Sequence, residues 1–352
     1  MEKVKKNKRS SRFKKYRNNG LTGLANLGNT CFLNSTIQCL SHTYEFNEFL
    51  NTKSYESRLN NKDESLILCE WDKLRNMMWS ENCVIQPSGF VKAIQQVARI
   101  KNRVIFTGYA QNDLTEFLDF CMSCFHDAIK REVEMVISGK AENDTDELAI
   151  KCYEMLKKMY SKEYSEVLTM FYGIEVSIIN SKESNYKSIT PEPFFNIMLP
   201  IGKTKTLMGC IDLYTESETL DGDNKLTNDK TNKKEVMQKK VQFWSFPNIL
   251  VFTLKRFSNI VRKNQEYIDY PLTDFDLSKY VMGYDDKKYV YDLYGICNHT
   301  GGVQGGHYYA YVKNANGKWY KFNDTSVSEI TNLATLQTPH AYCFFYRKQK
   351  CK

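Results

Sequence analysis

The sequence predicts an α+β fold, with helices in the first half of the chain and strands in the second. Apolar residues such as Leu33, Ile37 and Leu40 recur at helical spacing early in the chain. After Phe171, short apolar runs such as Ile-Leu-Val-Phe at 249–252 are typical of buried strands. Helical patterns that precede strand patterns indicate an α+β protein. With 352 residues, 42% of them hydrophobic, the chain can bury a sizeable core in one large or two average domains.

The first helix is predicted to begin at Cys31, where Asn29 or Thr30 can cap it. The apolar spacing of residues 71–78 predicts another helix, which ends before Pro87.

A further helix is predicted to open at Asn112 and Asp113, with Glu116 completing a capping box and a buried stripe that runs to Phe125. Residues 130–170 combine helical spacing with many charges, which predicts helices packed at the surface.

The second half of the chain is predicted to contain short strands separated by turn residues. Its polar, lysine-rich stretch at 221–240 is expected to be a long exposed excursion. The predicted strands cover residues 194–199, 243–257, 289–298, 306–312, 318–322 and 341–347.

The excess positive charge lies at the N-terminus. Residues 1–20 contain nine Lys or Arg and one acid, which leaves 40 basic and 40 acidic residues in the rest of a chain of net charge +8. This segment lacks apolar periodicity and is predicted to be a disordered tail. It could bind nucleic acid, an acidic partner or an import receptor, or it could be a solvated extension with no specific partner.

No apolar run approaches the ~20 residues that a membrane helix needs, and the charged N-terminus does not resemble a signal peptide. The eleven cysteines are scattered singly, which favours reduced thiols. We therefore expect no membrane partner and a soluble intracellular protein, in the cytoplasm or the nucleus. The abundance of Lys, Asn and Tyr is typical of an AT-rich genome, such as that of a protist or of a large DNA virus acting in its host cell.

One cysteine and one histidine, 276 residues apart, each lie in a distinctive sequence segment. Gly23–Ser35 reads GLANLGNTCFLNS around Cys31, and Gly301–Val312 reads GGVQGGHYYAYV around His307. A cysteine nucleophile needs a base within hydrogen-bond reach, which the fold can supply from a distant segment. The start of a helix favours a thiolate at Cys31. The alternative, a buried structural cysteine, describes most of the other ten.

These segments resemble the Cys box and the His box of the ubiquitin-specific protease family of deubiquitinases. The resemblance extends from Gly20 to Arg347 and implies a papain-like cysteine peptidase fold over residues 21–350, with a helical thumb at about 21–170 and β fingers and palm at about 171–350. It implies a thiol-dependent enzyme that hydrolyses the (iso)peptide bond after the C-terminal glycine of ubiquitin. Ubiquitin and ubiquitinated proteins would be its partners, and no cofactor is expected.

The resemblance also assigns catalytic roles. His307 would be the general base. Asn323 matches the residue that orients the histidine, and Asp324 would serve as its helper or substitute. Asn26 matches the asparagine that stabilises the oxyanion, although a loop asparagine could also be a turn residue.

Substrate-binding residues are implied in two segments. Gly305 and Gly306 let the backbone approach a Gly-Gly tail closely, and Tyr308 belongs to the same set. Gln111 and Asp113 resemble a family box that lines the cleft for the arginine-containing tail of ubiquitin. Asp113 could instead be only a helix cap.

The chain departs from the family pattern in the fingers, where many relatives hold zinc with two Cys-x-x-Cys pairs. Between Phe171 and Ser245 it has a single cysteine, Cys210, and no histidine. A tetrahedral site needs four such ligands, so we expect fingers without zinc and no metal. The pair Cys121 and Cys124 is expected to pack in the core.

Three alternatives to a deubiquitinase stay open. The protein could process a ubiquitin-like modifier, or it could be a catalytically weak ubiquitin-binding scaffold. A nucleic-acid-binding function would rest on residues 1–20 alone, because the rest of the chain has balanced charge.

Overall fold

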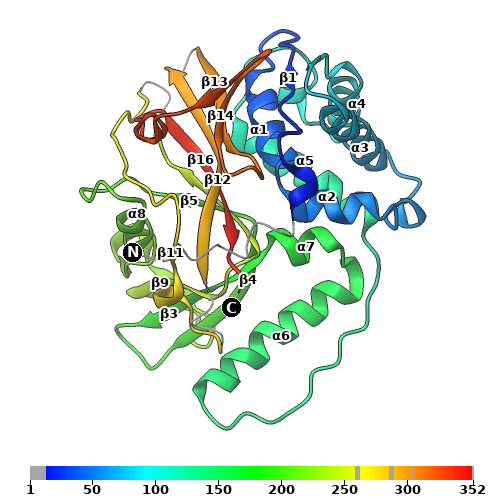
Figure 1. Cartoon of the computed structure of the whole chain (residues 1–352). Helices are drawn as coiled ribbons and strands as arrows, with labels where there is room; N and C mark the ends of the chain where they lie inside the picture. Colours follow the sequence, from blue (N-terminus) through cyan, green and yellow to red (C-terminus); the bar gives the residue numbers. More distant parts are fainter. Residues whose placement is uncertain (1–12, 258–261, 285–288, 303–304, 351–352) are drawn as a thin grey trace, which may run out of the picture. The chain divides into compact units, whose positions relative to one another are not determined.

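The computed structural model describes residues 13–257, 262–284, 289–302 and 305–350 (Figure 1). These residues form two compact units. The first comprises the chain up to Ile129, Phe257–Gln265 and Leu293–Phe345, and the second comprises Lys130–Arg256, Glu266–Asp292 and the chain from Tyr346. Helices and strands occur in both units, which confirms the predicted α+β class.

The first unit is built around α1 (Cys31–Ser41), which is buried along its whole length. It packs against α5 (Leu114–Ile129), where Phe32 meets Phe117 edge to face at 5.3 Å between ring centroids. The predicted helices at Cys31, at 71–78 and after Asp113 are confirmed. The other helices of this unit are α2 (Tyr44–Asn51), α3 (Glu64–Ser80), α4 (Ser88–Ile100) and the 3₁₀ turns Lys14–Tyr16, Glu56–Arg58, Val104–Phe106 and Leu333–Leu336.

A sheet lies against α1 in the same unit (Figure 1), with the strand order β15-β14-β13-β12-β16. The pairings of β12 with β13, β13 with β14 and β14 with β15 are antiparallel. A separate parallel pair joins β1 (Gly23–Leu24) to β2 (Val84–Ile85). The strands of the sheet are β12 (Val290–Gly301), β13 (Gly306–Lys313), β14 (Trp319–Asn323), β15 (Ser326–Ile330) and β16 (Ala341–Lys348).

The predicted disorder of the tail is wrong for residues 13–20, which are ordered on the first unit. Tyr16 is buried, stacks on Tyr44 at 4.7 Å and donates a hydrogen bond to Glu48. An aromatic side chain with such partners stabilises a segment that has no apolar periodicity of its own. Residues 1–12 of the predicted tail lie outside the described residues.

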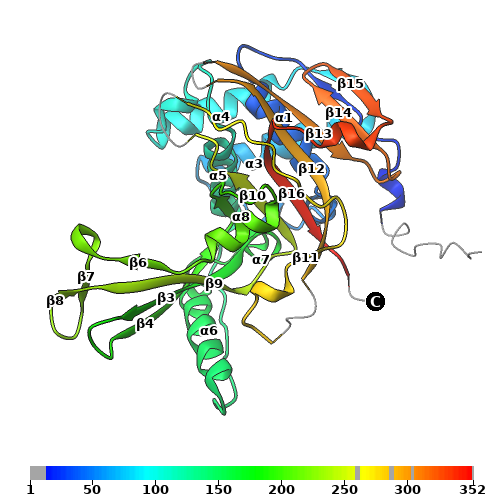
Figure 2. The same ribbon diagram turned by 90° about the vertical axis from the view of Figure 1, so that its left-hand side faces the viewer.

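The second unit contains a four-stranded antiparallel sheet, ordered β4-β3-β9-β6, with the hairpin β7–β8 near its far end (Figure 2). A fully buried strand, β10, pairs in parallel with β5. The strands are β3 (Gly173–Ser181), β4 (Lys187–Phe194), β5 (Asn196–Leu199), β6 (Glu218–Leu220), β7 (Leu226–Asn228), β8 (Lys233–Glu235), β9 (Met237–Ser245), β10 (Ile249–Leu254) and β11 (Phe275–Asp276).

Helices predicted for 130–170 are found only in part. The helices α6 (Asp144–Glu163) and α7 (Glu166–Phe171) form, but residues 132–143 are not helical. Asn143 caps α6 by accepting a hydrogen bond from the backbone N–H of Asp146, which fixes where that helix starts. This stretch belongs to the second unit, which also contains α8 (Leu207–Tyr214) and the 3₁₀ turns Gly222–Asn224 and Ser278–Tyr280.

The predicted exposed excursion at 221–240 contains the hairpin β7–β8 and a buried polar cluster. The carboxylate of Glu235, whose residue is 7% exposed, accepts hydrogen bonds from Ser181, from Ser184 at 2.6 Å and from Asn228 at 2.7 Å. These contacts join the β3–β4 turn to β8. The hydrogen bonds from Ser181 and Ser184 lower the pKa of Glu235 to about 2.

This cluster predicts an acid-sensitive stability. A carboxyl whose pKa is lower in the folded chain than its unfolded value of about 4.3 stabilises the fold above that value, and the contribution disappears as the pH falls towards 2. The melting temperature of Glu235→Gln should therefore lie below that of the wild type at pH 7, and the gap should narrow on acidification. Glu218→Gln, which replaces an exposed carboxylate on β6, is the matched control. A difference in melting temperature between the wild type and Glu235→Gln that stays constant from pH 7 to pH 3 would contradict the prediction.

None of the helices in the described ranges is long and apolar enough to cross a membrane.

Candidate active site

Cys31 is the first residue of α1 and is 3% exposed. The loop before it is held by Asn26, whose Oδ1 accepts hydrogen bonds from the backbone N–H groups of Gly28 and Thr30, both at 3.1 Å. Gly28 has a φ of +100°, a conformation that favours glycine. Asn26 therefore fixes the turn that delivers Cys31 to the start of the helix.

Burial opposes the predicted lowering of the Cys31 pKa by the helix start. Burial raises the pKa of the Cys31 thiol, and the negative charge of Asp324 raises it further. Hydrogen bonds from the backbone of Tyr308 and from the N–H groups at the helix start lower the pKa, but they do not outweigh burial. The thiol consequently needs a base to ionise.

His307 lies on β13, directly before the residue whose backbone hydrogen-bonds to Cys31. Its Nε2 is 2.5 Å from Oδ1 of Asn323, at the end of β14. With the amide oxygen as acceptor, His307 carries its proton on Nε2 and leaves Nδ1 as the basic nitrogen. Cys31, His307 and Asn323 thus lie in one unit, where the backbone of Tyr308 hydrogen-bonds to Cys31 and the ring of His307 hydrogen-bonds to Asn323.

Asp324 is not arranged as predicted, because no hydrogen bond between the described residues joins it to His307. Its Oδ2 accepts from Asn26 Nδ2 at 3.0 Å, and its Oδ1 accepts from Asn34 Nδ2 at 2.8 Å. Its backbone has a φ of +49°, which breaks the alternation of side chains along β14. Asp324 therefore supports the loop and the helix on either side of Cys31.

Asn34 was missed by the sequence analysis. It is 2% exposed, one helical turn after Cys31, and it donates to Asp324. The sequence did contain an indication of this role. Asn34 follows Cys31 by three residues, and residues at this spacing lie on the same face of a helix.

The two predicted substrate-binding segments meet. Gln111 Nε2 donates to the backbone carbonyl of Gly306 at 3.0 Å, and the N–H of Gly306 donates to Gln111 Oε1 at 3.2 Å. A Cβ at Gly306 would lie 2.2 Å from Nε2 of His299, so this position needs glycine. Gly305 is exposed, with open space around it.

Asp113 uses both carboxylate oxygens within the protein. Its Oδ1 caps α5 by accepting from the N–H of Thr115 at 2.7 Å, and its Oδ2 accepts from the hydroxyl of Tyr342 at 2.7 Å. Asp113 therefore acts as a helix cap, which was the alternative to a role in substrate binding. The side chain of Tyr308, predicted to contact substrate, is buried against His299 instead, with 4.4 Å between ring centroids.

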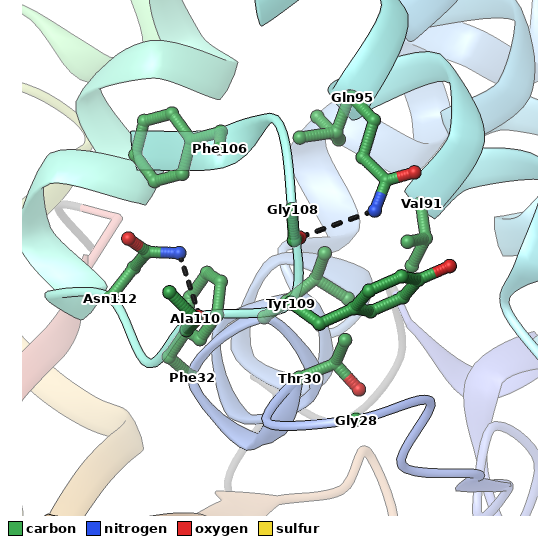
Figure 3. A pocket seen from close by; sticks show the side chains of 12 residues that line it. Gly28, Thr30, Phe32, Val91, Gln95, Phe106, Gly108, Tyr109, Ala110 and Asn112 are labelled. Atoms are coloured by element: carbon green, nitrogen blue, oxygen red, sulfur yellow. Dashed lines mark hydrogen bonds between the residues drawn. The ribbon is translucent and has the colours of Figure 1, made fainter. Parts of the chain in front are cut away.

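A small pocket lies beneath the loop that carries Gln111 (Figure 3). Gly28, Thr30 and Phe32 form one side, and the loop from Phe106 to Asn112 crosses above them. Asn29 Nδ2 donates to the carbonyl of Tyr109 at 2.9 Å, and Gln95 Nε2 donates to that of Gly108 at 3.2 Å. The first bond ties the loop that carries Gln111 to the cysteine loop, and the second ties it to α4. The remaining lining residues are Leu33, Val91 and Ile94.

His299, eight residues before His307, is buried against Tyr308. It is 5% exposed, its Nδ1 finds no hydrogen-bond partner among the described residues, and burial lowers its pKa to about 4. The ring therefore stays neutral near pH 7 and fills the space under Gly306. Within the described ranges, no group of three or more His, Cys, Asp or Glu could hold a metal ion.

Comparison with known proteins gives one consistent result. The family model described as ubiquitin carboxyl-terminal hydrolase matches residues 22–346. Ubiquitin carboxyl-terminal hydrolase 2 of Bos taurus is 35% identical over 339 residues, which cover 93% of this chain and 55% of that protein. The Gallus gallus protein of the same name is 36% identical over 342 residues, which cover 93% of both chains. The chain thus spans about half the length of the bovine relative.

Solved structures agree with the sequence relatives. The SAGA DUB module of Ubp8, Sgf11, Sus1 and Sgf73 bound to monoubiquitin contains a chain with a TM-score of 0.73 and 26% identity, matched over 96% of this chain and 71% of that one. The same module bound to ubiquitin aldehyde gives a TM-score of 0.72 at 26% identity, with the same coverage.

Proposed function

This chain belongs to the ubiquitin carboxyl-terminal hydrolase family, and on that premise we propose that it is a thiol-dependent deubiquitinase. It hydrolyses the (iso)peptide bond after the C-terminal glycine of ubiquitin. The observation that carries the proposal is the assembly of Cys31, His307 and Asn323, in which the residue after the histidine hydrogen-bonds to the thiol. The ubiquitin-bound state of a structural relative supports ubiquitin as the partner.

In the proposed reaction, Nδ1 of His307 takes the proton of Cys31 as the sulfur attacks the carbonyl carbon of the terminal glycine. The resulting oxyanion accepts a hydrogen bond from Asn26 Nδ2, which has one N–H bond left after its contact with Asp324. The imidazolium then protonates the leaving lysine amine, and a thioester remains on Cys31. Water, deprotonated by His307, attacks the thioester and releases ubiquitin and the free thiol.

Asp324 is proposed to act through Asn26 rather than through His307. Its two oxygens hold Asn26 and Asn34, one on each side of Cys31 along the chain. A carboxylate with two amide donors orients both without taking part in proton transfer. Asn323 alone then orients the imidazole.

The tail of ubiquitin is proposed to enter at the contact between Gln111 and Gly306. Their paired hydrogen bonds use the backbone donor and acceptor that an extended strand would need. The tail therefore either replaces Gln111 at these groups or passes beneath the pair, and in both cases only glycine residues fit beside Gly306.

The direct test uses ubiquitin with a C-terminal thiol-reactive warhead. We expect one covalent adduct per chain, located on Cys31 by peptide mass spectrometry, and none in Cys31→Ala. A parallel probe built on a ubiquitin-like modifier separates the two substrate classes. Labelling of Cys83, the exposed cysteine among the described ones, in place of Cys31 would refute the proposal.

Asp113 gives a prediction on substrate affinity. Asp113→Asn keeps the oxygen that caps α5 but removes the charge proposed to face the tail arginines. We expect KM for a ubiquitin C-terminal amide to rise about ten-fold with kcat unchanged, because a partly desolvated charge pair contributes about 1–3 kcal/mol. Asp63→Asn, at the start of α3, controls for loss of charge near a helix N-terminus. An unchanged KM would leave Asp113 with its capping role only.

We also propose that the protein acts inside cells, in the cytoplasm or the nucleus, and that residues 1–12 direct it to an acidic partner or to nucleic acid. Six of residues 1–12 are Lys or Arg, which supports this proposal. Imaging a fluorescent fusion with and without residues 1–12, together with a DNA-binding assay, tests both parts. The same distribution and no DNA binding in either form would refute the role of the tail.

A further inference from the structure

The residues before the family match are tied to the catalytic strand. We call residues 14–24 the strap. At its start, Tyr16 stacks on Tyr44 and meets Trp79 edge to face at 5.0 Å. Lys15 also forms an ion pair of 2.9 Å with Glu48 of α2. The strap is thereby anchored on the helices of the first unit.

The middle of the strap holds the turn that precedes β14, and Figure 2 shows this blue segment beside the end of the β13–β14 hairpin. The N–H of Asn18 donates to Oδ1 of Asn314 at 3.1 Å, and Asn314 Nδ2 donates to the carbonyl of Asn19 at 2.8 Å. Asn316 Nδ2 donates to Oδ1 of Asn18 at 2.8 Å. Asn314 is only 2% exposed, so its two bonds to the strap are partly shielded from water, whereas the bond from Asn316 to Asn18 is exposed.

The end of the strap holds the residues that follow β14. The N–H of Leu24 donates to the carbonyl of Asp324 at 2.8 Å. Gly23 lies so close to Thr325 that a Cβ would be 2.3 Å from its carbonyl oxygen. The five residues of β14 are therefore fixed at both ends by one continuous segment.

We propose that the strap positions β14, and through Asn323 the ring of His307, for catalysis. Asn18, Asn19 and Asn314 are then positioning residues, and the strap residues 14–21 lie outside the family match, which begins at residue 22. This inference rests on the proposed function and adds a segment to its machinery.

Catalysis requires the imidazole of His307 to be placed accurately. The bond of 2.5 Å between His307 and Asn323 fixes the imidazole, and a misplacement of about 1 Å in a catalytic group can lower a rate about 100-fold. The strap has no hydrogen bond to Gln111, Asp113 or Gly306 within the described part of the chain. Loss of the contacts between the strap and β14 should therefore lower kcat and leave KM unchanged.

The test compares two asparagine variants of the full chain. Asn314→Ala removes the side chain that both Asn18 and Asn19 contact. Asn332→Ala removes an asparagine of the same unit that caps a 3₁₀ turn at 3.0 Å and makes no hydrogen bond to the strap in the described ranges. We expect kcat of Asn314→Ala to fall about ten-fold with KM within two-fold of wild type, and Asn332→Ala to keep both values.

A readout without ubiquitin separates this inference from the proposed function. The rate at which iodoacetamide alkylates Cys31, followed by mass spectrometry across pH, reports how well the imidazole stabilises the thiolate. In Asn314→Ala the midpoint should move to higher pH, because a displaced imidazolium stabilises the thiolate less. Failure of the wild type to cleave ubiquitin amides would refute the proposed function and leave this midpoint shift as the test of the strap.

The strap would be only structural if Asn314→Ala lowered the melting temperature as Asn332→Ala does but kept the wild-type kcat and alkylation profile. If Asn314→Ala does not fold, Asn18→Gly takes its place. Asn18 has a φ of +62°, which glycine adopts readily, so this variant removes the bond to Asn316 alone. Wild-type values in Asn18→Gly would then overturn the proposal.

Discussion

Replacing Cys31 by alanine is expected to abolish cleavage of a ubiquitin C-terminal amide while ubiquitin still binds. The sulfur is the only atom lost, and the loop that Asn26 holds before α1 does not depend on it. His307→Ala should be nearly as inactive, because nucleophile and base act as a unit, and the loss in kcat should reach about 10⁴–10⁶-fold in both variants.

These variants are to be compared with Cys83→Ala, which removes an exposed thiol and should keep the wild-type rate. Steady-state kinetics give the rates, and titration with labelled ubiquitin gives the affinity. Turnover in Cys31→Ala, or full activity in His307→Ala, would show that the reaction uses other residues.

The parts of the site that could be predicted from the sequence depend on local patterns. Apolar residues at 33, 37 and 40 placed Cys31 at a helix start, and the structure confirms that placement. The predicted side-chain cap is wrong, because Thr30 at the N-cap position makes no capping hydrogen bond. The aromatic, β-branched run after His307 predicted a strand, which is β13. These patterns depend on residues within a few positions of one another, so one sequence is sufficient to read them.

The parts that could not be predicted depend on the tertiary fold. Burial of the Cys31 thiol raises its pKa, and no local feature of the sequence reports that burial. Likewise, Tyr16 contacts the rings of Tyr44 and Trp79, which are 28 and 63 residues further along the chain. A segment that folds by such distant contacts has no periodicity to detect.

The sequence also could not decide which of two neighbouring residues, Asn323 or Asp324, contacts the imidazole of His307. Both side chains could accept a hydrogen bond from an imidazole, so composition does not decide between them. Asn323 is the last residue of β14, whereas the left-handed backbone of Asp324 directs its carboxylate to Asn26 and Asn34. The positive φ of Asp324 therefore determines that Asn323, and not Asp324, contacts His307.

This geometry predicts a large effect for Asp324→Ala. The substitution frees Asn26 and leaves the amide of Asn34, 2% exposed, without its shortest hydrogen bond. Because loss of an oxyanion donor lowers rates about 10²–10³-fold, kcat should fall by that factor. The melting temperature should also fall, since a buried donor left unpaired costs about 1–3 kcal/mol. Asp324→Asn, which removes the charge that raises the pKa of Cys31, should move the alkylation midpoint to lower pH.

Two double-mutant cycles then distinguish the two roles of Asp324. If it acts through Asn26, the double variant Asn26→Ala/Asp324→Ala should be no slower than the worse of its single variants, because both remove the same oxyanion contact. In the same case, Asn323→Ala and Asp324→Ala should have multiplicative effects on kcat, because one disturbs the histidine and the other the oxyanion site. The reverse pattern, with coupling to Asn323 and independence from Asn26, would mean that Asp324 orients His307 during turnover despite its contacts in the free protein.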